Sequence, residues 1–95
     1  MTKLSDDEIR TALVDLPGWE HGDDLIAKEF GFPGFPDAVG FVVRLGMAAE
    51  KADHHPDLDV RYNKVRVALS THSEGGVTEK DVALAKVAEK ATSAS

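Results

Sequence analysis

Three of the chain's four histidines fall within one stretch, "DHHPDLDVRYNKVRVALSTH", where they could transfer protons or bind a metal. His54 and His55 are adjacent and precede Pro56, and His72 ends the apolar run that follows. Imidazole titrates near neutral pH, so a histidine can both give and take a proton there. Two histidines facing one substrate could protonate a leaving oxygen and accept a proton from a neighbouring atom. Acid–base catalysis is therefore one hypothesis for this stretch.

Three carboxylates could orient these imidazoles or raise their basicity: Glu50, Asp53 and Asp81. A metal site is an alternative, because Glu50 and His54 have the i, i+4 spacing that suits zinc and His72 could join them. Adjacent histidines diverge, so His54 and His55 cannot easily share one ion. We expect no metal site, since a third ligand is not specified by the sequence.

The plainest alternative is that the histidines are surface or packing residues. A histidine that follows a helix can cap the last carbonyl groups and interact favourably with the helix dipole. The residues alone leave this alternative open beside catalysis. His21 has no supporting neighbours in the sequence and is interpreted as a surface residue.

Length and composition predict one globular domain, residues 1–95. Hydrophobic residues make up 42% of the chain and charged residues 29%, as in a soluble protein with a modest core. The net charge of −6 argues against nucleic acid as the partner, because such binding depends on clustered Lys and Arg. The absence of cysteine excludes disulfides, zinc–thiolate sites and thiol catalysis.

The sequence shows no sign of a membrane segment or an export signal. The N-terminal "MTKLSDDEIR" lacks the apolar core of a signal peptide. No apolar run approaches the roughly 20 residues that span a bilayer. We therefore expect a cytoplasmic protein with no membrane partner.

The first third of the chain predicts a helix followed by two strands. Ser5 and Glu8 have the spacing of a capping box, and apolar residues recur at helical spacing until Pro17-Gly18 ends the helix. Residues 19–32 predict two short strands around a turn at Gly22-Asp23-Asp24.

The middle third predicts the longest helix, which begins near Pro36. Pro56 disfavours helical geometry at His55, so the adjacent histidines lie at or just beyond the C-terminus of this helix. Its apolar stripe consists of Ala38, Val42, Leu45, Ala49 and Ala52.

The last third predicts a β-hairpin over residues 58–72 and a final helix capped by Thr78. We expect the hairpin to turn at Asn63-Lys64 and His72 to fall on the side opposite the valines, where the strand ends. The predicted inner face of the second strand consists of Val65, Val67, Leu69 and Thr71.

The element order α-β-β-α-β-β-α predicts an α+β fold. Two hairpins joined by a helix favour one four-stranded antiparallel sheet with three helices on one face. The other face would be partly open, available to a ligand or to another subunit.

With these elements in place, the chain resembles the pterin-4a-carbinolamine dehydratases, also called 4a-hydroxytetrahydrobiopterin dehydratases. The specific combination is "DHHP" followed by "YNKV" and then "LSTH", with "LPGWE" before the first strand. The likeness runs from about Leu4 to Ala91. The matching residues are Glu50, His54-His55-Pro56, Tyr62-Asn63-Lys64-Val65, Leu69-Ser70-Thr71-His72, Gly76, Thr78 and Asp81.

The resemblance implies a hydro-lyase that recycles a cofactor. Its substrate is the 4a-hydroxytetrahydropterin left by an aromatic amino acid hydroxylase, and its product is quinonoid dihydropterin. Members of the family use no metal or bound cofactor and form homodimers or homotetramers.

The resemblance also implies roles for individual residues. His54, His55 and His72 match the catalytic histidines, and we expect His54 and His72 to transfer protons while His55 binds or orients the pterin. The residues expected to bind or orient the substrate are Glu50, Asp53, Pro56, Asp81 and Trp19.

A protein-binding function is the alternative. Animal members of the family also bind a homeodomain transcription factor as a dimerisation cofactor. The chain could therefore be a protein-binding module of the same fold that does not require catalysis.

Overall fold

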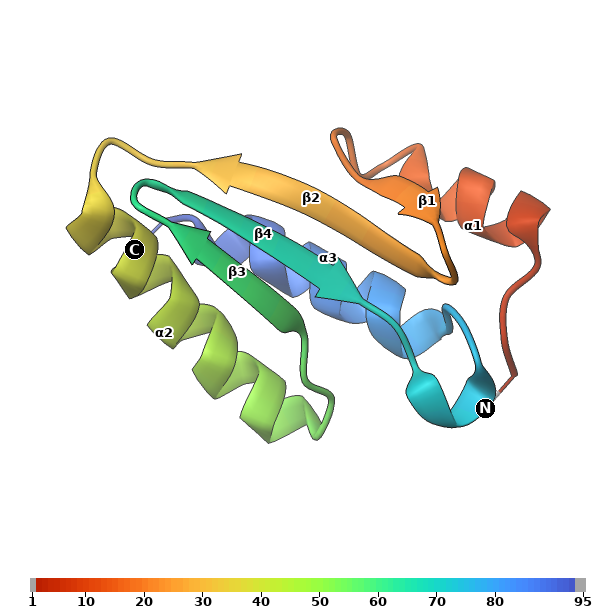
Figure 1. The fold of residues 1–95 in the computed structure, drawn as a ribbon. Helices are drawn as coiled ribbons and strands as arrows, with labels where there is room; N and C mark the ends of the chain where they lie inside the picture. Colours follow the sequence, from red (N-terminus) through yellow and green to blue (C-terminus); the bar gives the residue numbers. More distant parts are fainter. Residues whose placement is uncertain (1, 94–95) are drawn as a thin grey trace.

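The chain folds into a four-stranded antiparallel sheet and three α-helices, in a computed structural model that describes residues 2–93 (Figure 1). The sheet order is β1-β2-β4-β3. The α+β class and the element order are as predicted, and a short 3₁₀ helix, η1, is additional. The elements are α1 (Asp6–Leu13), β1 (Glu20–Gly22), β2 (Leu25–Gly31), α2 (Phe35–Ala52), β3 (Asp57–Arg61), β4 (Lys64–Leu69), η1 (His72–Glu74) and α3 (Glu79–Ala91).

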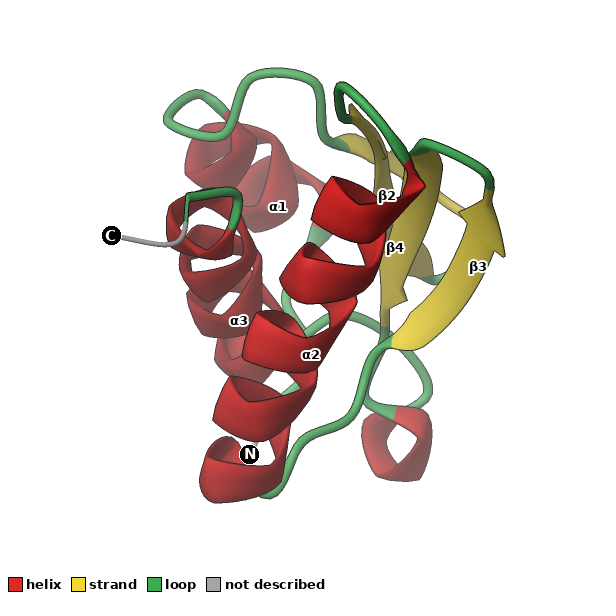
Figure 2. Cartoon of the chain, turned by 90° about the vertical axis from the view of Figure 1, so that its left-hand side faces the viewer, coloured by secondary structure: helices red, strands yellow, loops and turns green. Residues whose placement is uncertain are grey.

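The three helices cover one face of the sheet, as predicted, and leave the other face open (Figure 2). The core lies between these two layers, where the inner faces of the central strands β2 and β4 pack against the helices. The central strands contribute Ile26, Phe30, Val65, Val67 and Leu69, and the helices contribute Ile9, Ala38, Phe41, Leu45, Ala49, Leu84, Ala85 and Ala88.

The N-terminal helix and hairpin follow the local signals of the sequence. The Ser5 hydroxyl accepts the Glu8 N–H at 3.1 Å, and the Glu8 carboxylate accepts the Ser5 N–H at 2.8 Å. The predicted capping box is therefore confirmed. The β1–β2 turn places Asp23 and Asp24 at φ values of 52° and 63°, the left-handed region that a two-residue hairpin turn requires.

The predicted apolar stripe of α2 needs two corrections. Phe41, which it omits, is fully buried, with its ring centroid 4.9 Å from that of Phe30 and 5.1 Å from that of Phe32. Ala52, which it includes, is exposed because it lies in the last turn, just before Asp53 ends the helix. Within residues 2–93, neither α2 nor any other helix is long and apolar enough to cross a membrane.

The β3–β4 hairpin turns one residue earlier than predicted. Arg61 pairs with Lys64, so Lys64 already belongs to β4 and the turn consists of Tyr62 and Asn63. Tyr62 takes a φ of 53°, because a two-residue turn needs a left-handed residue at this position. Its side chain is exposed. The predicted inner face of β4, which continues to Thr71, is buried and is confirmed.

Candidate active site

The C-terminus of α2 turns the two adjacent histidines away from the helix. Asp53 takes a left-handed conformation with φ 54°, at the position that glycine most often occupies after a helix. The His54 N–H donates to the Ala49 carbonyl oxygen at 3.1 Å, which closes the last turn. Pro56 then leads the chain into β3. The structure thus gives Asp53 a backbone role in placing His54.

His54 points inward and contacts Asp81 in the first turn of α3. The distance from His54 Nε2 to Asp81 Oδ1 is 2.5 Å. The His54 side chain is 12% exposed and the Asp81 side chain is fully buried. The structure therefore brings together two residues that are 27 positions apart in the sequence.

Two threonines complete the surroundings of the Asp81 carboxylate. Its Oδ2 accepts the Thr71 hydroxyl at 2.8 Å and the Thr78 backbone N–H at 2.9 Å. The two threonine hydroxyls are 2.8 Å apart. Asp81 is also the N3 residue of α3, which closes the capping box that Thr78 begins. The capping box that starts α3 therefore holds the acidic partner of His54.

His55 points outward and contacts Glu50, with 2.7 Å between His55 Nε2 and Glu50 Oε1. The two side chains are 60% and 79% exposed. Glu50 thus contacts His55, whereas the metal hypothesis needed it beside His54. Among residues 2–93, no group of three or more His, Asp or Glu side chains is arranged to hold a metal ion.

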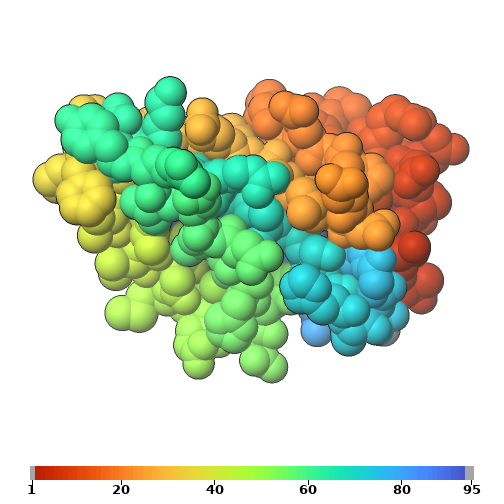
Figure 3. All heavy atoms as spheres, in the orientation of Figure 1, coloured from red at the N-terminus to blue at the C-terminus, as the bar shows by residue number. Residues whose placement is uncertain are grey.

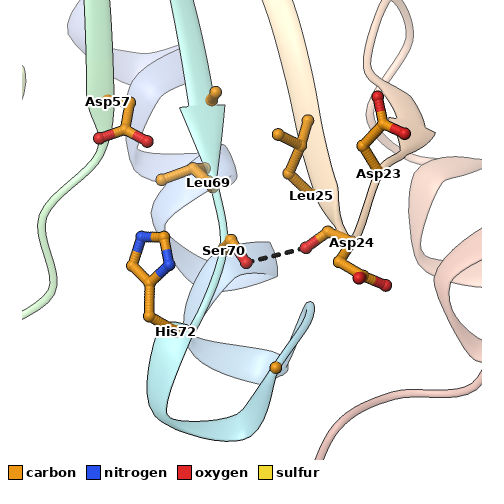
Figure 4. A pocket seen from close by; sticks show the side chains of 9 residues that line it. Asp23, Asp24, Leu25, Asp57, Leu69, Ser70 and His72 are labelled. Carbon is orange, nitrogen blue, oxygen red and sulfur yellow. Dashed lines mark hydrogen bonds between the residues drawn. The ribbon is translucent and has the colours of Figure 1, made fainter.

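His72 lies in η1, just after β4, and lines an open cavity of about 240 Å³ at the end of the sheet. Figure 4 shows its imidazole pointing toward the side chain of Asp57, which is the first residue of β3. The Ser70 hydroxyl donates to the Asp24 carbonyl oxygen at 2.8 Å, which joins two of the residues that line the cavity. The lining includes Asp23, Asp24, Leu25, Asp57, Leu69, Ser70 and His72.

The loop that carries His54 and His55 and the loop that carries His72 lie at the same end of the molecule (Figures 1 and 2). In the space-filling view, the cyan loop after β4 lies beside the orange β1–β2 turn (Figure 3). Thr71 connects the His54–Asp81 pair to the cavity that His72 lines, because it contacts Asp81 and directly precedes His72. The cavity itself is lined by His72 and not by His54 or His55.

The structure does not bring Trp19 to this cavity. Its side chain is 5% exposed and packs edge-on against Phe30, with ring centroids 5.9 Å apart. Its Nε1 donates to Glu89 at 2.8 Å, and Lys28 Nζ, which lies over the Phe30 ring, contacts the same carboxylate oxygen at 2.7 Å. A role for Trp19 in substrate binding stays a prediction.

Sequence reasoning missed several residues of this region. Asp57 and Ser70 line the cavity, and Thr71 contacts Asp81, but none of them was a candidate on its own. Thr71 did carry a signal, because a hydroxyl on a buried strand face requires a hydrogen-bond partner. Asp57 carried no comparable signal, since an exposed aspartate before a strand is common.

Known proteins resemble the chain over nearly its whole length. The family model described as pterin 4 alpha carbinolamine dehydratase matches residues 2–91. A relative from Roseiflexus sp. (strain RS-1) is 50% identical over 88% of this chain and 90% of its own. One from Thermomicrobium roseum is 45% identical over 97% of this chain and 100% of its own. Both bear the name "Putative pterin-4-alpha-carbinolamine dehydratase".

The similar solved structures include the following two. A transcriptional coactivator/pterin dehydratase from Brucella melitensis is 39% identical, with a TM-score of 0.92 over 97% of this chain and 100% of its own. A pterin dehydratase-like protein, a RuBisCO assembly factor of the alpha-carboxysome, is 18% identical. Its TM-score is 0.67 over 81% of this chain and 89% of its own, which shows a shared fold. By the family match and the identity to these relatives, the chain belongs to the pterin-4-alpha-carbinolamine dehydratase family.

Proposed function

We propose that the chain eliminates water from 4a-hydroxytetrahydropterin to give quinonoid dihydropterin. One observation carries the proposal beyond family membership. His54 is held 2.5 Å from a fully buried carboxylate, and His72, one residue beyond the network that holds this carboxylate, lines an open cavity. An arrangement that fixes one histidine and leaves a second accessible is suited to acid–base chemistry.

The proposed reaction needs one proton donor and one proton acceptor. Protonation of the 4a oxygen lets the C4a–O bond break and water leave. Loss of the N5 proton then leaves its electron pair to form the C4a=N5 double bond. The Asp81 carboxylate would stabilise the imidazolium that forms when His54 accepts this proton. We therefore assign the base to His54 and the acid to His72.

His55 and Glu50 have a different part in the proposal. Both are exposed, so their contact can open when a ligand arrives. Their imidazole and carboxylate groups offer hydrogen bonds to the polar edge of a pterin. This supports the expectation that His55 and Glu50 bind or orient the substrate.

The proposed elimination is neutral in oxidation state, so it requires no redox cofactor. We accordingly propose that pterin is the substrate and that the chain acts without a bound cofactor. The 4a-hydroxy compound is the product of an aromatic amino acid hydroxylase, which makes such an enzyme the source of the substrate.

An assay coupled to that hydroxylase tests the function. The hydroxylase generates 4a-hydroxytetrahydropterin, and a dihydropterin reductase reports the quinonoid product by oxidation of its nicotinamide. We expect the reductase signal to rise with the amount of this protein. A signal equal to that of the uncatalysed dehydration at every protein concentration would refute the proposal.

Protein binding is the second candidate function, and one surface favours it. Phe35, Val39, Val43 and Met47 recur every four residues along α2 and are 39% to 72% exposed. Apolar side chains in a row on a helix are typical of an assembly surface. The same surface would serve a homodimer or homotetramer, which the family resemblance implies.

Light scattering on the wild type and on Val43→Glu tests this surface. For a chain of 10.2 kDa, we expect a multiple of that mass in the wild type and a lower mass in the variant. A monomeric wild type would contradict self-association through α2. In that case, the protein-binding function would have to rest on a different partner.

A further inference from the structure

We propose that Thr71 is a positioning residue that sets the tautomer of His54, that is, the arrangement of its proton on one or the other ring nitrogen. Its hydroxyl fixes the Asp81 carboxylate so that His54 carries its proton on Nε2 and presents Nδ1 to the substrate. The kinetic consequence rests on the proposed dehydratase function. The proton arrangement itself does not, and it can be measured separately.

The direction of each hydrogen bond in the network follows from counting protons. The Lys80 backbone N–H can only donate, and it donates to the Thr78 hydroxyl oxygen at 3.2 Å. The Thr71 hydroxyl has one proton and gives it to Asp81 Oδ2. The contact between the two hydroxyls must therefore run from Thr78 to Thr71. A single directed chain leads from the Lys80 N–H to the carboxylate.

The carboxylate then fixes the proton on His54. Oδ2 of Asp81 already accepts two hydrogen bonds, one from the Thr71 hydroxyl and one from the Thr78 backbone N–H. Oδ1 faces His54 Nε2 at 2.5 Å. A carboxylate oxygen only accepts, so Nε2 must carry the proton. In the neutral ring, the lone pair that can act as a base is consequently on Nδ1.

Thr71 holds the carboxylate in this orientation through Oδ2, whereas His54 contacts Oδ1. Without its hydroxyl, Oδ2 would keep one donor, and the buried Thr78 hydroxyl would lose its acceptor. A buried polar group without a partner is costly, so the Asp81 side chain would rotate to recover hydrogen bonds. Rotation would move Oδ1 away from His54 and release its Nε2 proton to exchange between the ring nitrogens.

The backbone of Thr71 has a separate task, which makes the hydroxyl testable by itself. The Thr71 N–H donates to the Gly76 carbonyl at 2.8 Å, and the Glu74 N–H donates to the Thr71 carbonyl at 2.9 Å. These bonds hold the loop that carries His72. Thr71→Val keeps the backbone and the branched shape and removes the hydroxyl, whereas Thr71→Ser keeps the hydroxyl.

The test measures turnover and histidine proton arrangement in four proteins: wild type, Thr71→Val, Thr71→Ser and Val65→Ala. Val65 is fully buried in β4 and outside the network, so Val65→Ala is a control for loss of core packing. We expect Thr71→Val to lower kcat about 10- to 100-fold, with little change in KM. This loss is smaller than the roughly 10²–10⁴-fold that one whole proton transfer contributes, because the variant keeps His54 and disturbs only its position. Thr71→Ser should recover most of kcat, and Val65→Ala should lower the unfolding midpoint without this loss.

Nitrogen-15 NMR of labelled histidine gives the readout that folding alone would not move. At a pH where the ring is neutral, His54 of the wild type and of Thr71→Ser should carry its proton on Nε2. In Thr71→Val the proton should be shared between both nitrogens.

Two results would overturn the inference. One is a wild-type His54 with its proton on Nδ1, and the other is a Thr71→Val variant with unchanged kcat and unchanged proton arrangement. A wild type without dehydratase activity would refute the proposed function instead, and the NMR comparison would still decide the role of Thr71.

Discussion

His54 and His55 are neighbours in the sequence, and each contacts a carboxylate through Nε2. The His54 pair has side chains 12% and 0% exposed, whereas the His55 pair has side chains 60% and 79% exposed. Asp81 also receives a hydroxyl and a backbone N–H, which fix its position. Glu50, on the last full turn of α2, extends into solvent.

The difference shows that the backbone at the end of α2 places two identical side chains in different environments, one buried and one exposed. An exposed ion pair is screened by water and contributes little to stability. A buried carboxylate requires all its partners, and breaking such a set is costly. The buried pair is therefore suited to hold a histidine in one state, and the exposed pair is suited to rearrange around a ligand.

Alanine substitution of each histidine should give the largest contrast. We expect His54→Ala to lower kcat for dehydration by roughly 10²–10⁴-fold, because it removes the proposed base. His55→Ala should mainly raise KM, since it removes a group that binds the substrate without transferring a proton. Steady-state kinetics of both variants measure this. Equal losses of kcat would erase the proposed division between them.

Removal of each carboxylate should give the next contrast. We expect Asp81→Ala to lower the free energy of unfolding by about 3–5 kcal/mol, because His54, Thr71 and the α3 cap all lose a buried partner. Glu50→Ala should cost at most about 1 kcal/mol. Urea unfolding followed by circular dichroism measures both. A cost for Glu50→Ala as large as that for Asp81→Ala would show that burial does not separate the pairs.

The two capping boxes extend the comparison to the helices. Ser5 caps α1 at the surface, and Thr78 caps α3 inside the network. We expect Ser5→Ala to cost about 1 kcal/mol and Thr78→Ala about 2 kcal/mol or more, since the latter also removes the hydroxyl that donates to Thr71. The same unfolding experiment measures both, and equal costs would argue against a coupled network.

Salt should give the smallest effect. At 1 M salt the Debye length is about 3 Å, so exposed charges are screened. We expect the small difference in unfolding free energy between wild type and Glu50→Ala to vanish there, while the difference for Asp81→Ala persists. A salt-sensitive Asp81→Ala difference would contradict the burial of that pair.

The fold was predictable because its signals are local. The capping box at Ser5, the turn that includes Asp23 and Asp24, and the buried inner face of β4 each depend on neighbouring residues, and all three are confirmed. The error in the β3–β4 hairpin is a shift of its turn by one residue, and the pairing of the two strands decides such a shift. Whether the β3–β4 hairpin turns at Tyr62 or at Asn63 depends on its register, which pairs Arg61 with Lys64.

The site was predictable as a set of residues but not as a network. The sequence pointed to three histidines, yet it could not separate His54 from His55, because their burial depends on how Asp53 ends α2. The contact between His54 and Asp81 joins the end of α2 to the start of α3, and no local spacing indicates it. The role proposed for Thr71 depends on its contacts with Asp81 and Thr78, which the sequence does not show.

The most direct test of the proposed chemistry is the rate at which 4a-hydroxytetrahydropterin disappears in the presence of wild type and of a His54→Ala/His72→Ala double variant. Circular dichroism should confirm that the double variant is folded. We predict that the wild type accelerates the disappearance in proportion to its concentration and that the double variant returns it to the uncatalysed rate. Equal turnover by the two proteins would contradict the assignment of the chemistry to these histidines.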